Sequence, residues 1–168
     1  MTLYTIPEQR GSITGVVMTE LLPALLAADG ARWLVAADIW ATAISGLLSG
    51  VPTPQGRPAG LNEYHVVGPV WLPAHTAGLA SGLHQVIDGI FGLATAPSDE
   101  PMSCSSVVVA FDSSFWQVIT AHEAIVRGTL GADVESAPLE AGQVVDVGIA
   151  LEWQVLVGPD ALTLARRR

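Results

Sequence analysis

Apolar and polar residues alternate more regularly between Gln143 and Val157 than elsewhere in the chain. The apolar residues at every second position are Val145, Val147, Ile149, Leu151, Trp153, Val155 and Val157. A period of two is the pattern of a β-strand with one buried face, and Asp146, Glu152 and Gln154 fall on the opposite face. The pattern predicts one strand of roughly 50 Å, at about 3.4 Å per residue, part of which is expected to pair or pack beyond its own domain.

Helical spacing of apolar residues predicts two helices in the N-terminal third, after a short strand over Leu3 to Ile6. The first helix has Ser12 as its N-cap, a kink or restart at Pro23 and a stop at Gly30. The second helix runs from Trp33 to about Gly50. Its apolar residues are Trp33, Trp40, Ile44, Leu47 and Leu48.

A segment rich in proline and glycine follows, from Gly50 to Asn62. Its three prolines and three glycines exclude a regular element, so residues 51–62 are expected to form a long surface loop or an arm that reaches a neighbouring subunit. The pattern from Glu63 to Leu72 alternates well enough for a strand. Because Pro69 has no N–H to donate, this strand is expected at an edge or with a bulge.

The stretch from about Thr76 to Leu93 predicts a third helix with two adjoining stripes of residues. One stripe is apolar, and the other contains the four glycines Gly78, Gly82, Gly89 and Gly92. Because each glycine costs a helix about 1 kcal/mol relative to alanine, we expect another backbone to approach this face closely. Packing against the protein's own sheet is the simpler explanation, and contact with a helix of another subunit is the alternative.

The remaining pattern predicts a polar loop over Thr95 to Ser103, a buried strand over Val107 to Phe111, and a helix from Ser114 through Val126. The last of these segments also alternates as a strand would, so that alternative stays open. Together the elements predict an α+β fold in a single domain of residues 1–168. We expect two N-terminal helices, a mixed or antiparallel sheet of about four or five strands with a long C-terminal strand, and helices packed on one face.

The chain has few charges for its length. Half of its 168 residues are apolar and 14% are charged, with sixteen acids, seven arginines and no lysine, for a net charge of −9. Mean hydropathy is correspondingly high, at +0.46. Such a composition leaves apolar surface that we expect other subunits to cover. The excess of acids disfavours direct sequence-specific nucleic-acid binding and an anionic membrane, because both need clustered positive charge.

The sequence shows no targeting or membrane-spanning signal. The first residues lack the basic start and apolar core of a signal peptide, which favours cytoplasmic synthesis. The apolar segments Trp33 to Leu48 and Leu79 to Leu93 contain charged residues or histidine and are shorter than the roughly 20 residues that a bilayer requires. We therefore expect no membrane partner.

Few residues suggest chemistry. His84 and Asp88 lie four apart on the predicted third helix, a spacing that suits a carboxylate orienting an imidazole or a shared metal ion, although exposed pairs of this kind commonly have no role. The sequence from His122 begins like a zinc-protease helix, but Val126 stands where the second histidine is needed. Cys104, the single cysteine, is interpreted as a small buried thiol. We expect no catalytic residue, no cofactor and no metal site.

Charged residues gather in the last third of the chain. Six acids crowd the part from position 133 onward: Asp133, Glu135, Glu140, Asp146, Glu152 and Asp160. We expect these acids to form one solvated face, and Arg166, Arg167 and Arg168 to pair with that face or with a neighbouring subunit. The residues expected at an interface are therefore the three arginines, Trp153 and the four glycines of the predicted third helix.

Three functional hypotheses follow. The first is a non-enzymatic structural subunit of a homo-oligomeric assembly, with other protein subunits as further partners. A strand that ends in the sequence WLPA, a helix and a long closing strand form an order similar to that of the ring proteins that terminate siphophage tails, although the two N-terminal helices depart from it. This resemblance implies a phage virion component of tail-terminator or connector type. The alternatives are a small-molecule enzyme or binding protein with a pocket near His84, Asp88 and His122, and a bacterial immunity or adaptor protein whose acidic face meets a basic partner.

Overall fold

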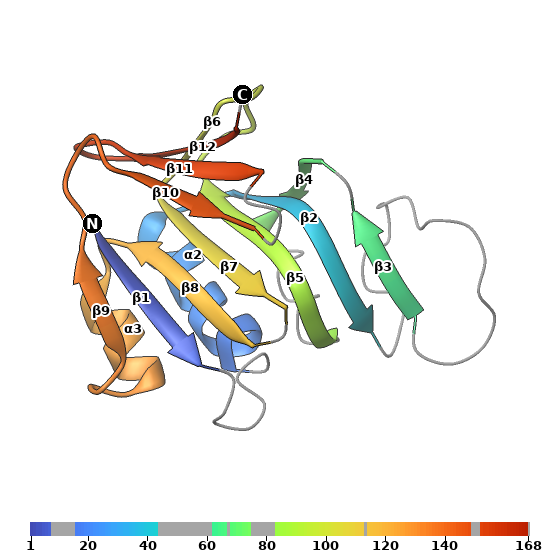
Figure 1. Cartoon of the computed structure of the whole chain (residues 1–168), viewed down its shortest axis with the longest axis horizontal. Helices are drawn as coiled ribbons and strands as arrows, with labels where there is room; N and C mark the ends of the chain where they lie inside the picture. The colour runs from blue at the N-terminus through green and yellow to red at the C-terminus, as the bar shows by residue number, and fades with distance from the viewer. Residues whose placement is uncertain are drawn as a thin grey trace.

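Strands dominate the structure. The computed structural model describes residues 1–7, 16–43, 62–66, 68–74, 83–112, 114–148 and 152–167. The strands of these residues form two antiparallel sheets, A and B, and the helices are short (Figure 1). The predicted α+β fold is therefore wrong, because two of its expected helices are strands and the described residues are mostly β.

Sheet A has eight strands. Seven of them follow one another in space in the order β3-β2-β5-β7-β8-β1-β9, and β4 also pairs with β2. Their bounds are β1 (Thr2–Pro7), β2 (Trp33–Ala43), β3 (Asn62–Val66), β4 (Val70–Pro73), β5 (Leu83–Ala94), β7 (Ser106–Phe111), β8 (Phe115–Thr120) and β9 (Glu135–Pro138). The strand predicted over Glu63 to Leu72, at an edge or with a bulge, is present as β3 and β4, which run in the same direction along β2. The register shifts by one residue between Val66 opposite Ile39 and Val70 opposite Ala36, and Gly68, whose φ is +86°, lies in this interruption.

Sheet B has four strands in the order β10-β11-β12-β6. Their bounds are β6 (Met102–Cys104), β10 (Val144–Val147), β11 (Trp153–Val157) and β12 (Leu162–Arg166). The single long strand predicted over 143–157 is wrong, because β10 and β11 pair antiparallel with Val147 opposite Trp153. Gly148, with a φ of +85°, starts the reversal that the alternating pattern did not reveal.

The described helical part lies within the first predicted helix and ends where that helix was expected to end. A π-helical turn η2 (Val17–Leu21) continues into α2 (Leu22–Asp29), and Pro23 lies in the first turn of α2. The helix ends at Gly30, whose φ of +60° and N–H bonds to the carbonyls of Ala27 and Leu26 make a left-handed C-cap. The predicted N-cap Ser12 lies outside the described residues. No helix among the described residues is long and apolar enough to cross a membrane.

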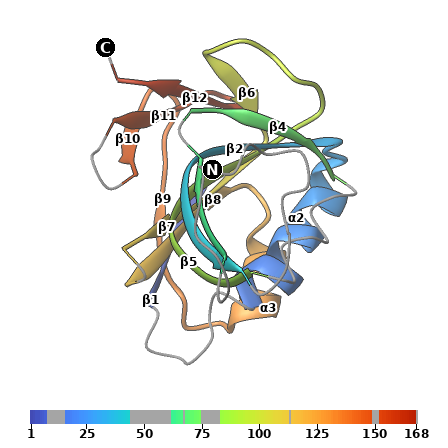
Figure 2. The same cartoon turned by 90° about the vertical axis from the view of Figure 1, so that its right-hand side faces the viewer.

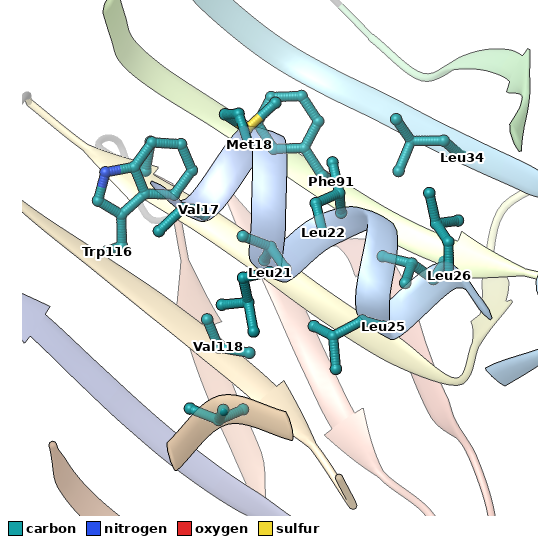
Figure 3. Packing of buried hydrophobic residues seen from close by; sticks show 14 of the residues in the cluster. Val17, Met18, Leu21, Leu22, Leu25, Leu26, Leu34, Phe91, Trp116 and Val118 are labelled. Atoms are coloured by element: carbon teal, nitrogen blue, oxygen red, sulfur yellow. The ribbon is translucent and has the colours of Figure 1, made fainter. Parts of the chain in front are cut away.

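Both faces of sheet A are covered at its centre, so the molecule has three layers (Figure 2). Along β7, Val108 and Ala110 pack in the cluster that contains the helices, whereas Val107 and Val109 pack in the cluster that contains sheet B. Figure 3 shows the helix side, where Leu22 of α2 lies among strand residues. Fully burying one such side chain contributes roughly 1.5 to 3 kcal/mol, so these two clusters account for much of the fold's stability.

This double burial explains why β2 and β5 were predicted as helices. In β2, Leu34 belongs to the helix-side cluster and Val35 to the sheet-B cluster, and in β5 Phe91 and Ile90 divide in the same way. A strand that is buried on both faces shows a continuous apolar run instead of alternation. Within such a run, apolar residues also fall at helical spacing.

The segment from Ser114 to Val126 combines the two alternatives that the sequence left open. Its first part is β8, the strand Phe115–Thr120. The chain then turns, and the helix α3 (Glu123–Leu130) begins after His122 and buries Val126 against the helix-side cluster. The preferred helix is therefore wrong for residues 115–120 and correct only from residue 123 onward.

Candidate functional site

Sheet B presents one of its faces to solvent. The side chains of Trp153 and Val155 on β11 point toward sheet A and are fully buried, whereas Leu156 points outward. Leu156 lies directly opposite Val144 of β10, and the two side chains are 42% and 54% exposed. We call this the outer face of sheet B. By register its residues are Val144, Asp146, Gln154, Leu156, Thr163 and Ala165.

A shallow pocket of about 760 Å³ lies on the outer face. It is lined by Glu100, Pro101, Gln154, Leu156, Thr163, Ala165, Arg166 and Arg167. Its lining residues offer an aliphatic side chain, an amide, a hydroxyl, one carboxylate and the guanidinium of Arg167. Each lining residue keeps partial or full contact with solvent, so the pocket is an open trough rather than an enclosed cavity.

Asp38 joins the two sheets beneath this pocket. The Trp153 indole donates a hydrogen bond from Nε1 to Asp38 Oδ2 at 2.6 Å, and the Gly68 N–H donates to Asp38 Oδ1 at 3.3 Å. Asp38 has a φ of +46°, and the pairing of β2 with β5 shifts register just after Ala37. This irregularity in β2 directs the carboxylate toward sheet B, where it accepts bonds from two other parts of the chain.

Arg166, the last residue of β12, and Arg167 after it point to opposite faces of sheet B. The Arg166 guanidinium carbon lies 5.2 Å from the centroid of the Trp153 ring, within the range of a cation–π interaction. The backbone N–H of Arg166 donates to Glu100 Oε1. Arg167 Nη1 lies 3.5 Å from Asp146 Oδ2 across the outer face. Of the predicted interface residues, Trp153 and Arg166 are therefore in contact, Arg167 pairs with Asp146 on the outer face, and Arg168 lies outside the described residues.

The glycines predicted at an interface have a different role. Gly78 and Gly82 lie outside the described residues. Gly92 is in β5, where a Cβ would lie 2.6 Å from Cys104 Sγ and 2.7 Å from Val35 Cγ1. A Cβ on Gly89 would lie 3.1 Å from the Phe91 ring. The close approach expected at this stripe is therefore present at Gly92, but it joins two sheets of one chain and does not involve a helix.

The structure does not bring Asp88 and His122 into one pocket. Asp88 Oδ1 accepts a hydrogen bond from the N–H of Asp112 at 2.7 Å, in the turn that leads into β8. His122 follows the other end of β8, so the length of that strand separates the two residues by roughly 20 Å. His84 is in β5, and its side chain lies outside the described part of the structure.

Each of these two residues has a nearby partner of its own. His122 Nε2 lies 2.7 Å from Asp29 Oδ1, which ties the start of α3 to the end of α2. The pKa of Asp88 is raised overall, and burial of the carboxyl is the largest cause. The hydrogen bond from the Asp112 N–H acts in the opposite direction, while the negative charge of Asp112 adds to the increase. Two pairs at opposite ends of a strand do not make a combined acid–base site.

Cys104 is buried, as the sequence indicated, and burial raises the pKa of its thiol to about 12. A thiol with such a pKa stays protonated near neutral pH and is a poor nucleophile. Among the residues that the structure describes, no group of three or more histidine, cysteine, aspartate or glutamate side chains is placed to hold a metal ion.

Sequence reasoning missed Asp38, Glu100 and the exposed pair of Val144 and Leu156. Asp38 had left a signal, because it is a charged residue inside an apolar run. Its partner Trp153 lies 115 positions away, and no local pattern connects residues at that distance. Leu156 falls among the polar positions of the alternating pattern, which point to solvent. An apolar residue at such a position was the sequence signal for an interaction surface.

Comparisons with known proteins give no relative that bears on this site. No protein-family model matches the chain, and neither curated proteins nor solved structures give a match. The functional argument therefore depends on the outer face of sheet B and its pocket.

Proposed function

We propose that this chain is a non-enzymatic structural subunit that associates with copies of itself and with other protein subunits through the outer face of sheet B. The observation that carries the proposal is the exposed pair of Val144 and Leu156. These side chains adjoin across two strands beside an open pocket, whereas the inward residues of the same strands are buried or, at Val145, partly buried. An apolar row with polar and charged groups around it is the composition of a protein–protein interface.

Composition supports the same proposal. With 14% charged residues and half of its residues apolar, the chain has little polar material to cover its surface. Association would remove the apolar row from water at roughly 25 cal/mol per Å² of apolar surface. The surrounding polar groups, Gln154 and Thr163, can make hydrogen bonds at the edge of such a contact.

The chemistry of the described residues favours a structural role over an enzymatic one. Asp88 and His122 lie at opposite ends of β8, and the thiol of Cys104 is buried and protonated near neutral pH. An adaptor that binds a basic partner is the second candidate. The observation that favours it is that the six acids from Asp133 to Asp160 are all exposed.

A phage tail or connector is the assembly that we propose to examine first. The strand that ends in WLPA is present as β4, but the helix expected after it is the strand β5, and the long closing strand is a pair of shorter strands. Support for this narrower proposal is therefore weaker than for a structural subunit in general. Neighbouring portal and tail genes would support it, and neighbouring metabolic or toxin genes would contradict it.

Two adjacent residues of β11 provide the test of the structural role. Leu156→Asp should leave the protein folded, because this side chain points to solvent, and should weaken self-association at least about tenfold. Val155→Asp places the same charge in the buried cluster, at a cost of several kcal/mol, and should unfold the protein. Sedimentation velocity over a micromolar concentration series measures association, and thermal melting measures folding.

Ala124→Asp is the control, since Ala124 is exposed on α3 in another layer of the molecule. This variant should associate like the unchanged protein. A chain that is a monodisperse monomer throughout the concentration series would contradict the proposed function. Unchanged association in Leu156→Asp would assign the contact to another surface.

A further inference from the structure

We propose that the end of sheet A that sheet B leaves uncovered binds an extended basic segment of a partner protein, which adds as a strand to the open edge of β10. Figures 1 and 2 show sheet B over one end of sheet A, while β1 and the hairpin of β7 and β8 extend beyond it. This surface is separate from the outer face of sheet B. Binding there is independent of the self-association proposed above.

Cross-strand pairing defines two rows of residues on this surface, which we call the uncovered rows. The first row is Glu135, Thr5 and Gln117, on β9, β1 and β8. The second row is Phe115, Phe111 and Asp88, on β8, β7 and β5. Both rows are on the face toward sheet B, because Phe111 and Val109, which is opposite Gln117, pack in the cluster that contains sheet B. Each residue of the two rows is partly or fully exposed.

Acidic residues stand at both ends of the uncovered rows. Glu135 is at the β9 end, and Asp88 is at the β5 end, where its carboxylate accepts the N–H of the exposed Asp112. Four strand spacings separate β9 from β5, which is about 19 Å at about 4.8 Å per spacing. The residues of the rows between them, on β1, β8 and β7, are uncharged.

The basic groups that the structure places lie elsewhere. Arg32 precedes β2 at the far end of that strand, Arg127 is on the helix side of sheet A, Arg166 is beside Trp153 between the sheets, and Arg167 is on the outer face of sheet B. The amino terminus is at the covered end of β1. A segment with positive charges about 19 Å apart would therefore complement the acids of the uncovered rows.

Strand β10 supplies main-chain groups for such a segment. It is the edge of sheet B, and β11 is its one partner among the described strands. The Val157 N–H donates to the carbonyl of Gln143 at 2.9 Å. Backbone groups alternate in direction along a strand, so Val144 and Asp146 turn their N–H and C=O groups to the open edge. An unprotected edge of this kind is a template for another strand.

The open edge of β10 borders the uncovered rows. β10 ends next to Gly148, where an added Cβ would lie 3.4 Å from Ile90 Cδ1, and Asp88 is the next residue of β5 on the same face. Because sheet A continues beneath this edge, a strand that brings a second layer with it, as β10 of another copy would, has no room there. A single extended segment fits, since strand addition needs only one strand.

The uncovered rows also offer contacts for the side chains of the segment. The rings of Phe111 and Phe115 stack with centroids 4.6 Å apart and present an apolar surface in the middle of the second row. Among the described residues, Gln117 Oε1 is shielded from water and accepts no hydrogen bond. The pKa of Asp88 is raised, with burial as the largest cause, so a cation beside this carboxyl would be stabilising.

A designed peptide tests the proposal. The probe is a fluorescein-labelled peptide with blocked termini, arginine at both ends, and alternating threonine and valine between them (RTVTVTR). At about 3.4 Å per residue its two arginines lie about 20 Å apart on one face of the strand. Fluorescence anisotropy with the full chain should show saturable binding. A peptide of the same composition with adjacent arginines (RRTVTVT) should bind at least about fivefold more weakly, which separates the spacing from general attraction to an acidic protein.

Charge removal on the protein identifies the surface. Glu135→Gln and Asp88→Asn should each weaken binding of the RTVTVTR peptide by about threefold to tenfold, and the asparagine can still accept the N–H of Asp112. Asp160→Asn is the matched control, because it removes one charge from an exposed position in the turn between β11 and β12. This control should bind the peptide like the unchanged protein. Thermal melting first establishes that each variant is folded.

A proline tests the strand addition itself. Val144→Pro removes an N–H from the open edge without removing a bond to β11, so the protein should stay folded and peptide binding should fall at least about tenfold. Val144→Thr keeps the N–H and should bind like the unchanged protein.

The other outcomes would overturn the proposal. Equal binding of the two peptides, no binding of either, or unchanged binding in both Glu135→Gln and Asp88→Asn would show that the uncovered rows do not receive a basic segment. Binding that survives Val144→Pro would exclude strand addition to β10. If the RTVTVTR peptide dissociates copies of the chain in sedimentation velocity, the occupant is a second copy and a separate partner protein is wrong. None of these results bears on the outer face of sheet B, which Leu156→Asp tests.

Discussion

Burial controls the chemistry of Cys104. Burial raises the pKa of its thiol in the folded chain to about 12, from an ordinary value of 9.0. Between these values the unfolded chain loses the thiol proton while the folded chain keeps it, so the free energy of unfolding must decrease as pH rises through this window. We expect Cys104 to account for a loss of about 1 kcal/mol between pH 8 and pH 10.

Urea unfolding at pH 8 and pH 10, compared between the unchanged protein and Cys104→Ala, measures this contribution. The variant starts from lower stability because it leaves a cavity, but its decline between the two pH values should be smaller by about the amount above. Equal declines would mean that the Cys104 thiol is not protected from ionisation by the fold.

Single residues were predictable where the property was local. The burial of Cys104 followed from its residue type, and the stop at Gly30 followed from helix-capping rules. The partnership of Asp38 with Trp153 was not predictable, because it depends on an irregularity in β2 and on the docking of a second sheet. Trp153 was expected at an interface, and its indole is instead buried between sheets of the same chain.

At the level of elements, Gly92 sets how closely sheet B can approach β5. Gly92→Ala would place a methyl group 2.6 Å from Cys104 Sγ, so the two sheets must separate locally. We expect a loss of about 1 to 3 kcal/mol in the free energy of unfolding, measured by urea unfolding.

Gly128→Ala is the contrasting variant. Gly128 lies in α3 with no atom within 4 Å of the added Cβ, so alanine should stabilise the protein by up to about 1 kcal/mol. The same chemical change should thus have opposite effects in the two elements. A tolerated Gly92→Ala would contradict close packing between the sheets.

Elements were predictable where one face is exposed or a strong local signal exists. Strand β7 was recognised from its run of valines, and η2 with α2 from helical spacing between Val17 and Gly30. Strands β2 and β5, like β7, are buried on both faces, but they were missed because their longer apolar runs also place residues at helical spacing. The turn that begins at Gly148 was missed because the apolar period continues across it in the sequence.

At the level of the whole molecule, the three layers predict an order of local stability. Strand β7 pairs on both edges, with β5 and β8, and is covered on both faces, so its amides should exchange with solvent only when the whole domain unfolds. Strand β9 is exposed along its length and should exchange fastest among the strands of sheet A. Hydrogen–deuterium exchange followed by mass spectrometry measures both, and equal protection of β7 and β9 would contradict the layered core.

The docking of sheet B also constrains how a cell can make this protein. The face of β7 that carries Val107 and Val109 is covered by strands that lie later in the chain, and β6 acquires its partner only when β12 is present. At about 5 to 20 residues per second, a ribosome needs roughly 3 to 11 s to pass from Phe111 to Arg166. During that interval the nascent chain exposes the valine face of β7, and chaperones bind exposed apolar surface of this kind. Once the C-terminal strands are complete, they cover this face and remove it as a site of aggregation.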